Sequence, residues 1–326
     1  MKMTGLITTA LLGLLLQGCT AMPPAEDPGA PATFYDTTVR DHQQQPVPLS
    51  RLADVLATAD VVVIGEFHGH QGAHLLQARL QASLHQRRPG QVLAMEAFNT
   101  DVQAVIDRYL GDKLGEDELI EDASAWDNYR GSYRPLMEYA RRHRIPVIAA
   151  NAPSALVRCT GREGAAYVES LPEDRRQALP SEPFPQVPGY RERFFETLGG
   201  SHGDHSAENR ERLENTYLAQ LLRDSTMAAQ ILKARQDYPD HQVLMITGTF
   251  HSEQRQGLVA ILEQRPPELE VRVLTPFMGE GEGRPAVVQG DYWYQLWPLP
   301  PRYRDENRER QQMMEQFRNR PTPECS

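Results

Sequence analysis

The sequence has few cysteines, no surplus of basic residues and only one long apolar run. That run lies at the amino terminus of a chain that is 40% hydrophobic, so the remainder is expected to fold as a soluble body. The formal net charge is −10 and basic patches are absent, which excludes nucleic acid as an expected partner. Arginine far outnumbers lysine, which favours planar, bidentate contacts with carboxylates.

The apolar run has the order of an export signal. Lys2 gives a short positive start, residues 6–16 are apolar, and Cys19 follows Leu16 after two short spacers. An apolar run of about eleven residues is too short to cross a hydrocarbon core of about 30 Å as a helix. The pattern therefore predicts a cleaved secretory signal at residues 1–18 rather than a membrane span.

The cleavage site predicts a lipid anchor. Leucine, two spacers and a cysteine form the lipobox of bacterial lipoproteins, so Cys19 is expected to be acylated and to begin the mature chain. Thr20 stands where an aspartate would favour inner-membrane retention, which favours the outer membrane, on its periplasmic side rather than at the cell surface. The alternative is an ordinary signal peptide with an incidental cysteine. Residues 19–33 are rich in proline and small side chains and are expected to form a flexible tether.

The other two cysteines leave room for one disulfide. If Cys19 is acylated, Cys159 and Cys325 remain, and an oxidising compartment would permit them to pair. Such a bond would attach the C-terminal segment covalently to the folded domain. The sequence leaves open whether the two residues are close.

Residues 34–300 have the pattern of one α/β domain. Short apolar runs alternate with longer helical patterns, which predicts a mainly parallel sheet flanked by helices. The expected strands are 61–64, 91–95, 145–150, 241–247 and 270–274, with an edge strand within 286–297. The expected helices are 71–87, 100–110, 116–122, 133–144, 206–235 and 254–264. A proline-rich insertion, 172–188, is expected to lack regular structure, and the charged tail, 301–326, is expected to hold a solvated helix.

Two of the expected strands end in the same tetrapeptide, Gly-x-Phe-His. Residues 65–68 follow the first strand and residues 248–251 follow the fourth. Side chains at the carboxyl ends of strands in an open α/β sheet meet in one crevice. The glycines are expected to let the backbone turn sharply as it leaves the sheet. The residues expected at this edge are Glu66, His68, Glu96, Asn151 and His251.

These edge residues allow two interpretations. Two histidines and one or two carboxylates that converge at a strand edge suit a metal site of the mixed nitrogen and oxygen type, for a divalent ion such as Mn, Zn or Co. With an open coordination position such a metal would activate water. Alternatively, each histidine caps a helix or bonds a backbone carbonyl. The repetition of the tetrapeptide after two buried strands favours a functional site.

A segment rich in aromatic and arginine residues, 126–135, borders the same crevice. It opens the helix that leads into the third strand, so it begins at the carboxyl edge of the sheet. Aromatic rings give flat apolar walls, and arginine pairs well with carboxylates. The segment therefore suits a planar ligand that bears acid groups, although a loop packed around its tryptophan would show the same residues. The candidate binding residues are Trp126, Tyr129, Arg130, Tyr133 and Arg134.

The helical pattern at 206–235 predicts a helix longer than the strands of the sheet. At 1.5 Å per residue it spans about 45 Å, which exceeds a strand of about 20 Å. Its carboxyl half must lie along the sheet to reach the fourth strand, so its amino half is expected to project past the crevice as a wall. Tyr190 belongs to this projection, as do His202 and His205, which are interpreted as a surface loop rather than a metal site.

Together these segments resemble the ChaN-like haem-binding lipoproteins, within the Tiki and erythromycin-esterase-like superfamily. The resemblance covers roughly residues 61–274 and includes both Gly-x-Phe-His tetrapeptides and the segments 95–96, 126–135, 150–153 and 223–228. It implies an α/β domain that binds haem in iron acquisition, with haems held between two protomers. It also implies a tyrosine ligand for the haem iron, which suits ferric haem. Tyr190 is preferred because it lies in the projecting insertion, and Tyr129 and Tyr133 are the alternatives.

Two functions follow as hypotheses. The preferred one is a membrane-tethered haem-binding lipoprotein that stores or relays haem during iron uptake and forms a homodimer on binding it. The alternative is a metal-dependent hydrolase of the cell envelope. Related Tiki proteins are metal-dependent peptidases, and the resemblance would map their metal ligands and general base onto His68, Glu96, His251 and Glu66. A purely structural envelope lipoprotein would leave the repeated tetrapeptide unexplained.

Overall fold

The computed structural model describes residues 30–199, 206–265, 268–279, 283–319 and 325. The predicted signal peptide, Cys19 and most of the predicted tether lie outside these residues, as do His202 and His205. The last residues of the predicted tether are described, and there the Thr33 N–H donates to Asp36 Oδ2 (2.9 Å) at the start of a tight turn. In the part of the chain that is described, no helix is long and apolar enough to cross a membrane.

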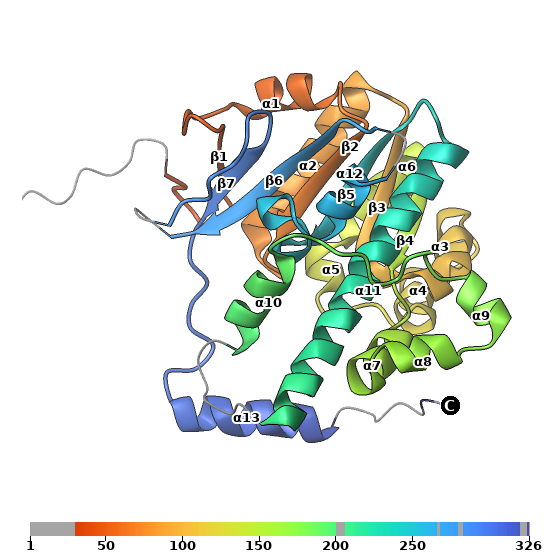
Figure 1. Ribbon diagram of the computed structural model, residues 1–326. Coiled ribbons are helices and arrows are strands. Elements are labelled where there is room, and N and C mark those ends of the chain that lie inside the picture. The colour runs from red at the N-terminus through yellow and green to blue at the C-terminus, as the bar shows by residue number, and fades with distance from the viewer. Residues whose placement is uncertain (1–29, 200–205, 266–267, 280–282, 320–324, 326) are drawn as a thin grey trace, which may run out of the picture.

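A seven-stranded sheet forms the centre of the molecule (Figure 1). Its order is β1-β7-β6-β2-β5-β3-β4, and all neighbouring strands are parallel except β1 and β7. The predicted mainly parallel sheet is confirmed. The strands are β1 (Thr38–Arg40), β2 (Val61–Glu66), β3 (Gln91–Asn99), β4 (Val147–Asn151), β5 (Gln242–Gly248), β6 (Val271–Met278) and β7 (Tyr292–Leu296).

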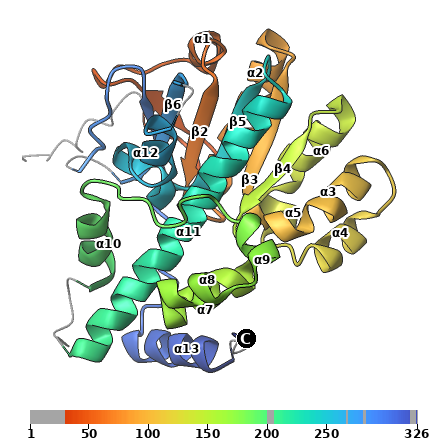
Figure 2. The ribbon, with the colours of Figure 1, turned by 45° about the vertical axis from the view of Figure 1, so that its right-hand side comes forward.

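Helices cover both faces of this sheet (Figure 2). One face packs against α1 to α6, and the other packs against α10, α11 and α12. The α-helices are α1 (Leu49–Leu56), α2 (Gln71–Arg87), α3 (Gln103–Leu110), α4 (Glu116–Asp122), α5 (Tyr129–Ser132), α6 (Arg134–His143), α7 (Ser154–Glu163), α8 (Ala165–Ser170), α9 (Glu173–Gln177), α10 (Tyr190–Gly199), α11 (Ala207–Asp237), α12 (Leu258–Glu263) and α13 (Glu306–Asn319). Short 3-10 helices are η1 (Thr100–Val102), η2 (Thr249–His251) and η3 (Glu253–Arg255).

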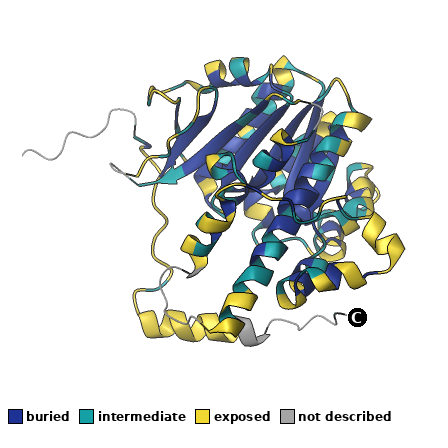
Figure 3. Cartoon of the chain, in the orientation of Figure 1, coloured by how far each residue is buried: buried dark blue, intermediate teal, exposed yellow. Residues whose placement is uncertain are grey.

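Burial on both faces explains the composition of the central strands. In β2, Val61 and Val63 join the core under α11 and α12, whereas Val62 and Ile64 join the core under α1 and α2. Successive side chains of a strand point to opposite faces, so a strand covered on both sides is apolar throughout. Figure 3 shows the result, a buried sheet inside helices whose outer faces are exposed.

Three predictions of regular structure are wrong. The expected edge strand corresponds to β7, which is internal because the short strand β1 pairs with it. The proline-rich insertion contains α9, because Pro172 precedes the first helical residue, where a proline breaks no hydrogen bond of the helix. β3 continues past Glu96 to Asn99, with a shift of register against β4 after Met95.

The long helix and the tail are placed as predicted. The carboxyl half of α11 lies along the sheet and its amino half extends beyond it, with α10 on one side and α7 and α8 on the other (Figures 1 and 2). A disulfide joins Cys159 in α7 to Cys325, which confirms the pairing that the sequence allowed. It ties the end of the chain to α7, and α13 lies beyond the amino half of α11 as a largely exposed helix.

Candidate functional site

The two Gly-x-Phe-His tetrapeptides lie side by side at the carboxyl edge of the sheet. β2 and β5 are neighbours, and Glu66 stands opposite Gly248 in their register. A Cβ atom at Gly248 would lie 2.9 Å from His68 Nε2, and one at Gly65 would lie 3.0 Å from Ser252 Oγ. Residues at the end of the neighbouring strand therefore approach each glycine more closely than a Cβ atom ordinarily allows.

The close approach of neighbouring residues explains these two glycines, and the sharp turn that the sequence predicts does not. Gly248 has a φ of −57°. Neither Gly248 nor Gly65 is among the described glycines with positive φ, the conformation that other residues avoid. The expectation that they let the backbone turn sharply is wrong, and the packing of one tetrapeptide on the other is the physical reason for a glycine in each.

The first tetrapeptide holds a half-exposed imidazole on a buried carboxylate. His68 Nδ1 lies 2.9 Å from Glu66 Oε1, and the His68 side chain is 46% exposed. Glu66 also accepts hydrogen bonds from Tyr133 Oη (2.5 Å) and Gln77 Nε2 (2.6 Å). Burial alone would raise the pKa of Glu66, but the bond to His68 and the charge of His74 outweigh burial and lower it. Burial likewise opposes protonation of His68, but the bond to Glu66 raises its pKa.

The second tetrapeptide holds a buried imidazole between two acids. His251 Nδ1 lies 2.7 Å from Asp224 Oδ1, and its Nε2 lies 3.3 Å from Glu96 Oε1. Burial would lower the pKa of His251, but the charges of Glu96 and Asp224 outweigh burial and raise it to about 10. Burial would raise the pKa of Glu96, but His251 and the Gly248 N–H, which donates to Glu96 Oε2 (2.6 Å), hold it well below its usual range. The site therefore holds an imidazolium at neutral pH.

Asn151 links the end of β4 to this group. Its Nδ2 donates to the Glu96 backbone oxygen (3.1 Å), and its Oδ1 accepts from Arg223 Nη1 (3.0 Å). Arg223 of α11 is partly buried, and this burial lowers its pKa. The structure thus brings together the residues expected at the carboxyl edge, which are Glu66, His68, Glu96, Asn151 and His251.

Sequence reasoning missed the role of Asp224, although a signal for it exists. Asp224 is fully buried and accepts hydrogen bonds from Tyr190 Oη (2.8 Å) and from the Leu258 N–H (3.1 Å), besides its contact with His251. It lies between Leu221 and Ala228 on the apolar face of α11. An acid on the apolar stripe of a helix is rarely buried without a partner, so this position indicates a paired carboxylate.

The edge residues do not fit the predicted divalent metal site. Among the described residues, no group of three or more His, Cys, Asp or Glu is arranged to hold a metal ion. Both ring nitrogens of His251 face acids, His68 Nδ1 is bonded to Glu66, and His68 Nε2 faces Gly248. Both nitrogens of His251 and Nδ1 of His68 are therefore already engaged by neighbouring acids.

The aromatic segment borders the site, but its arginines are engaged elsewhere. The Trp126 ring meets the His68 ring edge to face, with centroids 4.9 Å apart. Arg134 bonds Glu116 with both Nε (2.5 Å) and Nη2 (2.8 Å), and Arg130 pairs with the next acid of α4. Trp126 thus lies against His68 at the carboxyl edge, whereas Arg130 and Arg134 are paired with acids of α4.

The three candidate tyrosines are buried. Tyr129, Tyr133 and Tyr190 are at most 2% exposed. Tyr133 donates to Glu66 and Tyr190 donates to Asp224, and burial together with these acids raises the pKa of both phenols well above the usual range. Burial also raises the pKa of Tyr129. A tyrosine that ligates ferric iron does so as the phenolate, and these hydroxyls are held neutral and away from solvent.

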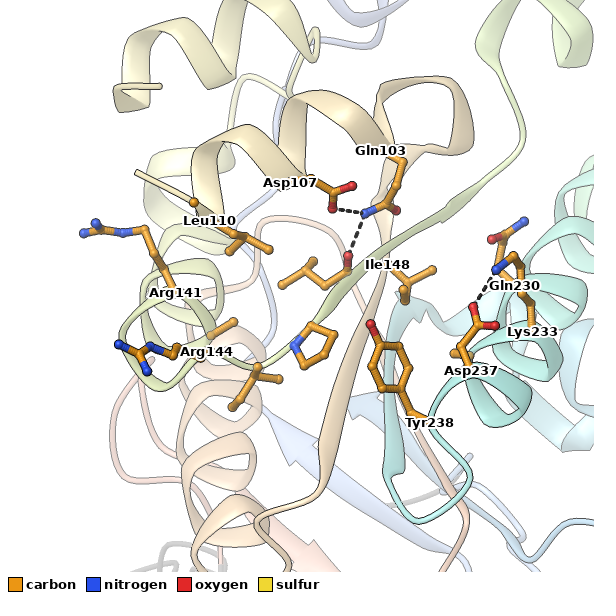
Figure 4. A pocket seen from close by; sticks show the side chains of 16 residues that line it. Gln103, Asp107, Leu110, Arg141, Arg144, Ile148, Gln230, Lys233, Asp237 and Tyr238 are labelled. Carbon is orange, nitrogen blue, oxygen red and sulfur yellow. Dashed lines mark hydrogen bonds and ion pairs between the residues drawn. The ribbon is translucent and has the colours of Figure 1, made fainter. Parts of the chain in front are cut away.

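A hollow beside the edge strand β4 is separate from this site (Figure 4). It has a volume of about 500 Å³, lies among α3, α6 and the end of α11, and none of the predicted site residues is in its described lining. Gln103 Nε2 donates to the Val147 carbonyl (2.9 Å), and its Oε1 accepts from the Ala149 N–H (2.7 Å). This side chain therefore takes the place of a further strand and covers the open edge of the sheet.

Comparison with known proteins agrees with the fold and identifies the family. A family model described as "Haem-binding uptake, Tiki superfamily, ChaN" matches residues 52–262, which include both tetrapeptides. The fold is similar to that of ChaN of Campylobacter jejuni, whose structure is described as showing cofacial haem binding. The TM-score is 0.61 at 16% identity, over 81% of this chain and 98% of that chain. An erythromycin esterase, EreC, matches with a TM-score of 0.44 at 14% identity, over 85% of this chain and 87% of that chain. No curated protein matches the sequence.

Proposed function

The chain belongs to the ChaN family of haem-binding uptake proteins in the Tiki superfamily, and on this basis we propose that it binds haem at the carboxyl edge of its sheet and relays or stores it during haem uptake. The observation that carries the proposal is the extent of the family match, which includes the whole network from Glu66 to His251. The half-exposed edge of that network, with Trp126 beside His68, supports this location.

The residues at this edge fit a haem by shape and polarity. Haem is a flat, mostly apolar ring whose iron takes an axial ligand from the protein. Trp126 offers an aromatic wall, and the exposed part of His68 continues it. The bond from His68 Nδ1 to Glu66 holds this ring in place beside Trp126.

A haemin titration tests this proposal directly. The purified full chain in detergent micelles should acquire a saturable, stoichiometric Soret band above a blank of micelles alone. Trp126→Ala should weaken binding because it removes the aromatic wall, while Tyr238→Phe, at the other end of the sheet, should not. If the wild-type chain shows only the partitioning seen in the micelle blank, the proposal is wrong.

The lipid anchor belongs to the same proposal. The sequence from Lys2 to Cys19 supports export and acylation, and an outer-membrane tether would keep the haem site in the periplasmic space. Cys19→Ala should release the protein from the membrane fraction. We also propose that haem brings two copies together, because the similar ChaN structure is described as binding haem cofacially. Light scattering with and without haemin would show the change in mass.

A metal-dependent hydrolase has less support. The donor atoms of His68, Glu96 and His251 are already directed to protein partners. Retention of a stoichiometric divalent ion by the purified chain, lost in His68→Ala, would restore this alternative.

A further inference from the structure

Two histidines and a tyrosine meet at the amino edge of the sheet, away from the proposed haem site. His85 lies in the last turn of α2, and Tyr139 and His143 lie one turn apart at the end of α6. Since α2 leads into β3 and α6 leads into β4, both helices end where these two parallel strands begin. This edge is opposite the one that holds the two Gly-x-Phe-His tetrapeptides.

The three rings form one cluster. The ring centroids of His85 and His143 are 5.3 Å apart, and those of Tyr139 and His143 are 4.2 Å apart. His85 Nδ1 lies 3.2 Å from Tyr139 Oη. The tyrosine thus holds both imidazoles, one by a hydrogen bond and the other by ring contact. In the described part of the chain, His85 Nε2 and both ring nitrogens of His143 have no hydrogen-bond partner.

The packing of α2 on α6 fixes the backbone under this cluster. Gln81 Nε2, one turn before His85, donates to the Leu136 backbone oxygen (3.2 Å), and both residues are fully buried. Leu84 of α2 and Ala140 of α6 belong to the same core. The two histidines therefore come from elements that are already joined, so little conformational freedom is lost when one ligand binds both.

The separation of the two imidazoles suits a single tetrahedral ion. With a metal–nitrogen distance of about 2.05 Å, each ring centroid lies about 3.2 Å from the metal, so two imidazoles on a tetrahedral ion have centroids about 5.2 Å apart. Neighbouring imidazoles on a square-planar ion would have centroids about 4.5 Å apart. The observed 5.3 Å between His85 and His143 agrees with the tetrahedral value. Zn²⁺ takes this geometry and binds neutral imidazole.

The position of the cluster at two helix ends also favours a cation. The carbonyl end of a helix carries a partial negative charge, and His85 and His143 each lie in the last turn of a helix. Arg142 and Arg144 flank His143 in the chain, but both are exposed, so solvent and salt screen their charges. The cluster therefore combines imidazole ligands with a favourable electrostatic position.

We propose that His85 and His143 bind a divalent transition metal ion that prefers tetrahedral coordination, Zn²⁺ above all. His85 binds through Nε2, and its Nδ1–H then donates to Tyr139 Oη, the kind of outer hydrogen bond that orients metal-binding histidines. Water completes the coordination, because groups of three or more His, Cys, Asp or Glu arranged for a metal are absent from the described residues. The ion joins the ends of α2 and α6, and its binding does not depend on haem.

A zinc titration tests the site in the full chain, freed of metal with a chelator and followed by calorimetry in detergent micelles. The wild type should bind Zn²⁺ saturably and in equimolar amount. His85→Gln and His143→Gln should each weaken binding by at least about tenfold, because each removes one of the two protein ligands. Tyr139→Phe keeps the ring but removes the outer hydrogen bond, and should weaken binding about tenfold. His241→Gln, which removes a single imidazole packed on Tyr238 at the same edge, is the matched control and should bind as the wild type does.

Two further measurements separate a metal site from a cluster of packed rings. Co²⁺ in place of Zn²⁺ should give the strong visible absorption of a tetrahedral ion in the wild type and not in His85→Gln. Zn²⁺ should raise the midpoint of thermal unfolding of the wild type, because an ion that binds only the folded state stabilises it. The double variant His85→Gln/His143→Gln should show no such rise.

The results that would overturn the proposal are distinct. If the wild type binds no Zn²⁺ saturably, or if the double variant binds it as tightly as the wild type, the two histidines are not a metal site. If His68→Gln removes the binding and His85→Gln does not, the ion lies at the carboxyl edge and the hydrolase alternative gains support. Far-UV circular dichroism checks the fold of each variant, and His143→Gln keeps the test valid because that side chain is exposed.

Discussion

The two Gly-x-Phe-His tetrapeptides share a sequence pattern, a position after a buried strand and a place at one edge of the sheet, yet their histidines differ. The His68 side chain is 46% exposed and bonds a carboxylate of its own tetrapeptide, Glu66. The His251 side chain is 8% exposed and lies between acids from two other elements, Glu96 and Asp224. The second residue of the tetrapeptide accounts for part of the contrast, because Thr249 occupies the position of Glu66.

The difference between the two histidines shows which properties of the site depend on the tetrapeptide and which depend on the rest of the fold. The shared pattern places an imidazole at the end of a strand and a glycine where the other copy packs. The charge and burial of that imidazole depend on residues far away in the sequence, above all Asp224 in α11. We therefore expect the first copy to face the ligand and the second copy to hold the edge together.

Removal of the two histidines should give the largest contrast. His251→Ala leaves Glu96 and Asp224 buried without their shared cation, and breaking a buried ion pair from one side costs about 3–5 kcal/mol. His68→Ala should cost about 1 kcal/mol or less, because His68 is half exposed and Glu66 keeps its bonds from Tyr133 and Gln77. Urea unfolding of both variants measures the two free energies. Equal losses would show that the burial difference has no energetic consequence.

Substitution of the two glycines should give a smaller contrast. A Cβ at Gly65 would lie 3.2 Å from the Thr249 Cα, which is backbone and cannot move alone, so Gly65→Ala should destabilise by about 1–3 kcal/mol. At Gly248 the nearest atoms belong to the His68 ring, which is half exposed and can turn away, so Gly248→Ala should cost less. Thermal unfolding of the two variants ranks them, and a larger loss in Gly248→Ala would contradict this account.

Much of the fold can be predicted because burial on both faces leaves a strong pattern. The continuous apolar run of β2 and the periodic leucines of α2 are visible in the sequence, and α2 (Gln71–Arg87) has the predicted bounds. β1 (Thr38–Arg40) cannot be recognised in this way, since three residues carry no periodicity and its partner β7 is distant in the sequence. Because the sequence does not reveal β1, it also mispredicts β7, which β1 covers, as an edge strand.

The candidate site divides in the same way. The ends of parallel strands predict that Glu66, Glu96 and His251 meet, because topology alone brings them to one edge. Topology does not decide which way a side chain points or what it bonds. Tyr190 was preferred as a ligand for its place in the insertion, but its hydroxyl donates to Asp224 inside the core.

The pH dependence of stability should give the effect that is most specific to one residue. Burial opposes the charge on His251, but Glu96 and Asp224 raise its pKa to about 10, above the value of about 6.5 expected for an unfolded chain. A group whose pKa is raised on folding contributes stability that is fully present below its unfolded pKa and is lost as the pH rises through its folded pKa. Between these values the folded state binds more protons than the unfolded state, so the free energy of unfolding should fall by up to about 1.4 kcal/mol per pH unit.

The matched variant assigns this slope to one residue. The His251→Gln variant, whose side chain at this position is neutral, should be less stable than the wild type at pH 7. It should lose less stability than the wild type between pH 7 and pH 10, because glutamine has no proton to release. His68→Gln should keep most of the wild-type slope, since the His68 side chain is half exposed and solvent screens its interactions. Urea unfolding at a series of pH values measures all three slopes. If the slope disappears in His68→Gln and persists in His251→Gln, the roles of the two tetrapeptides are reversed. His68, and not His251, would then be the residue whose protonation makes stability depend on pH.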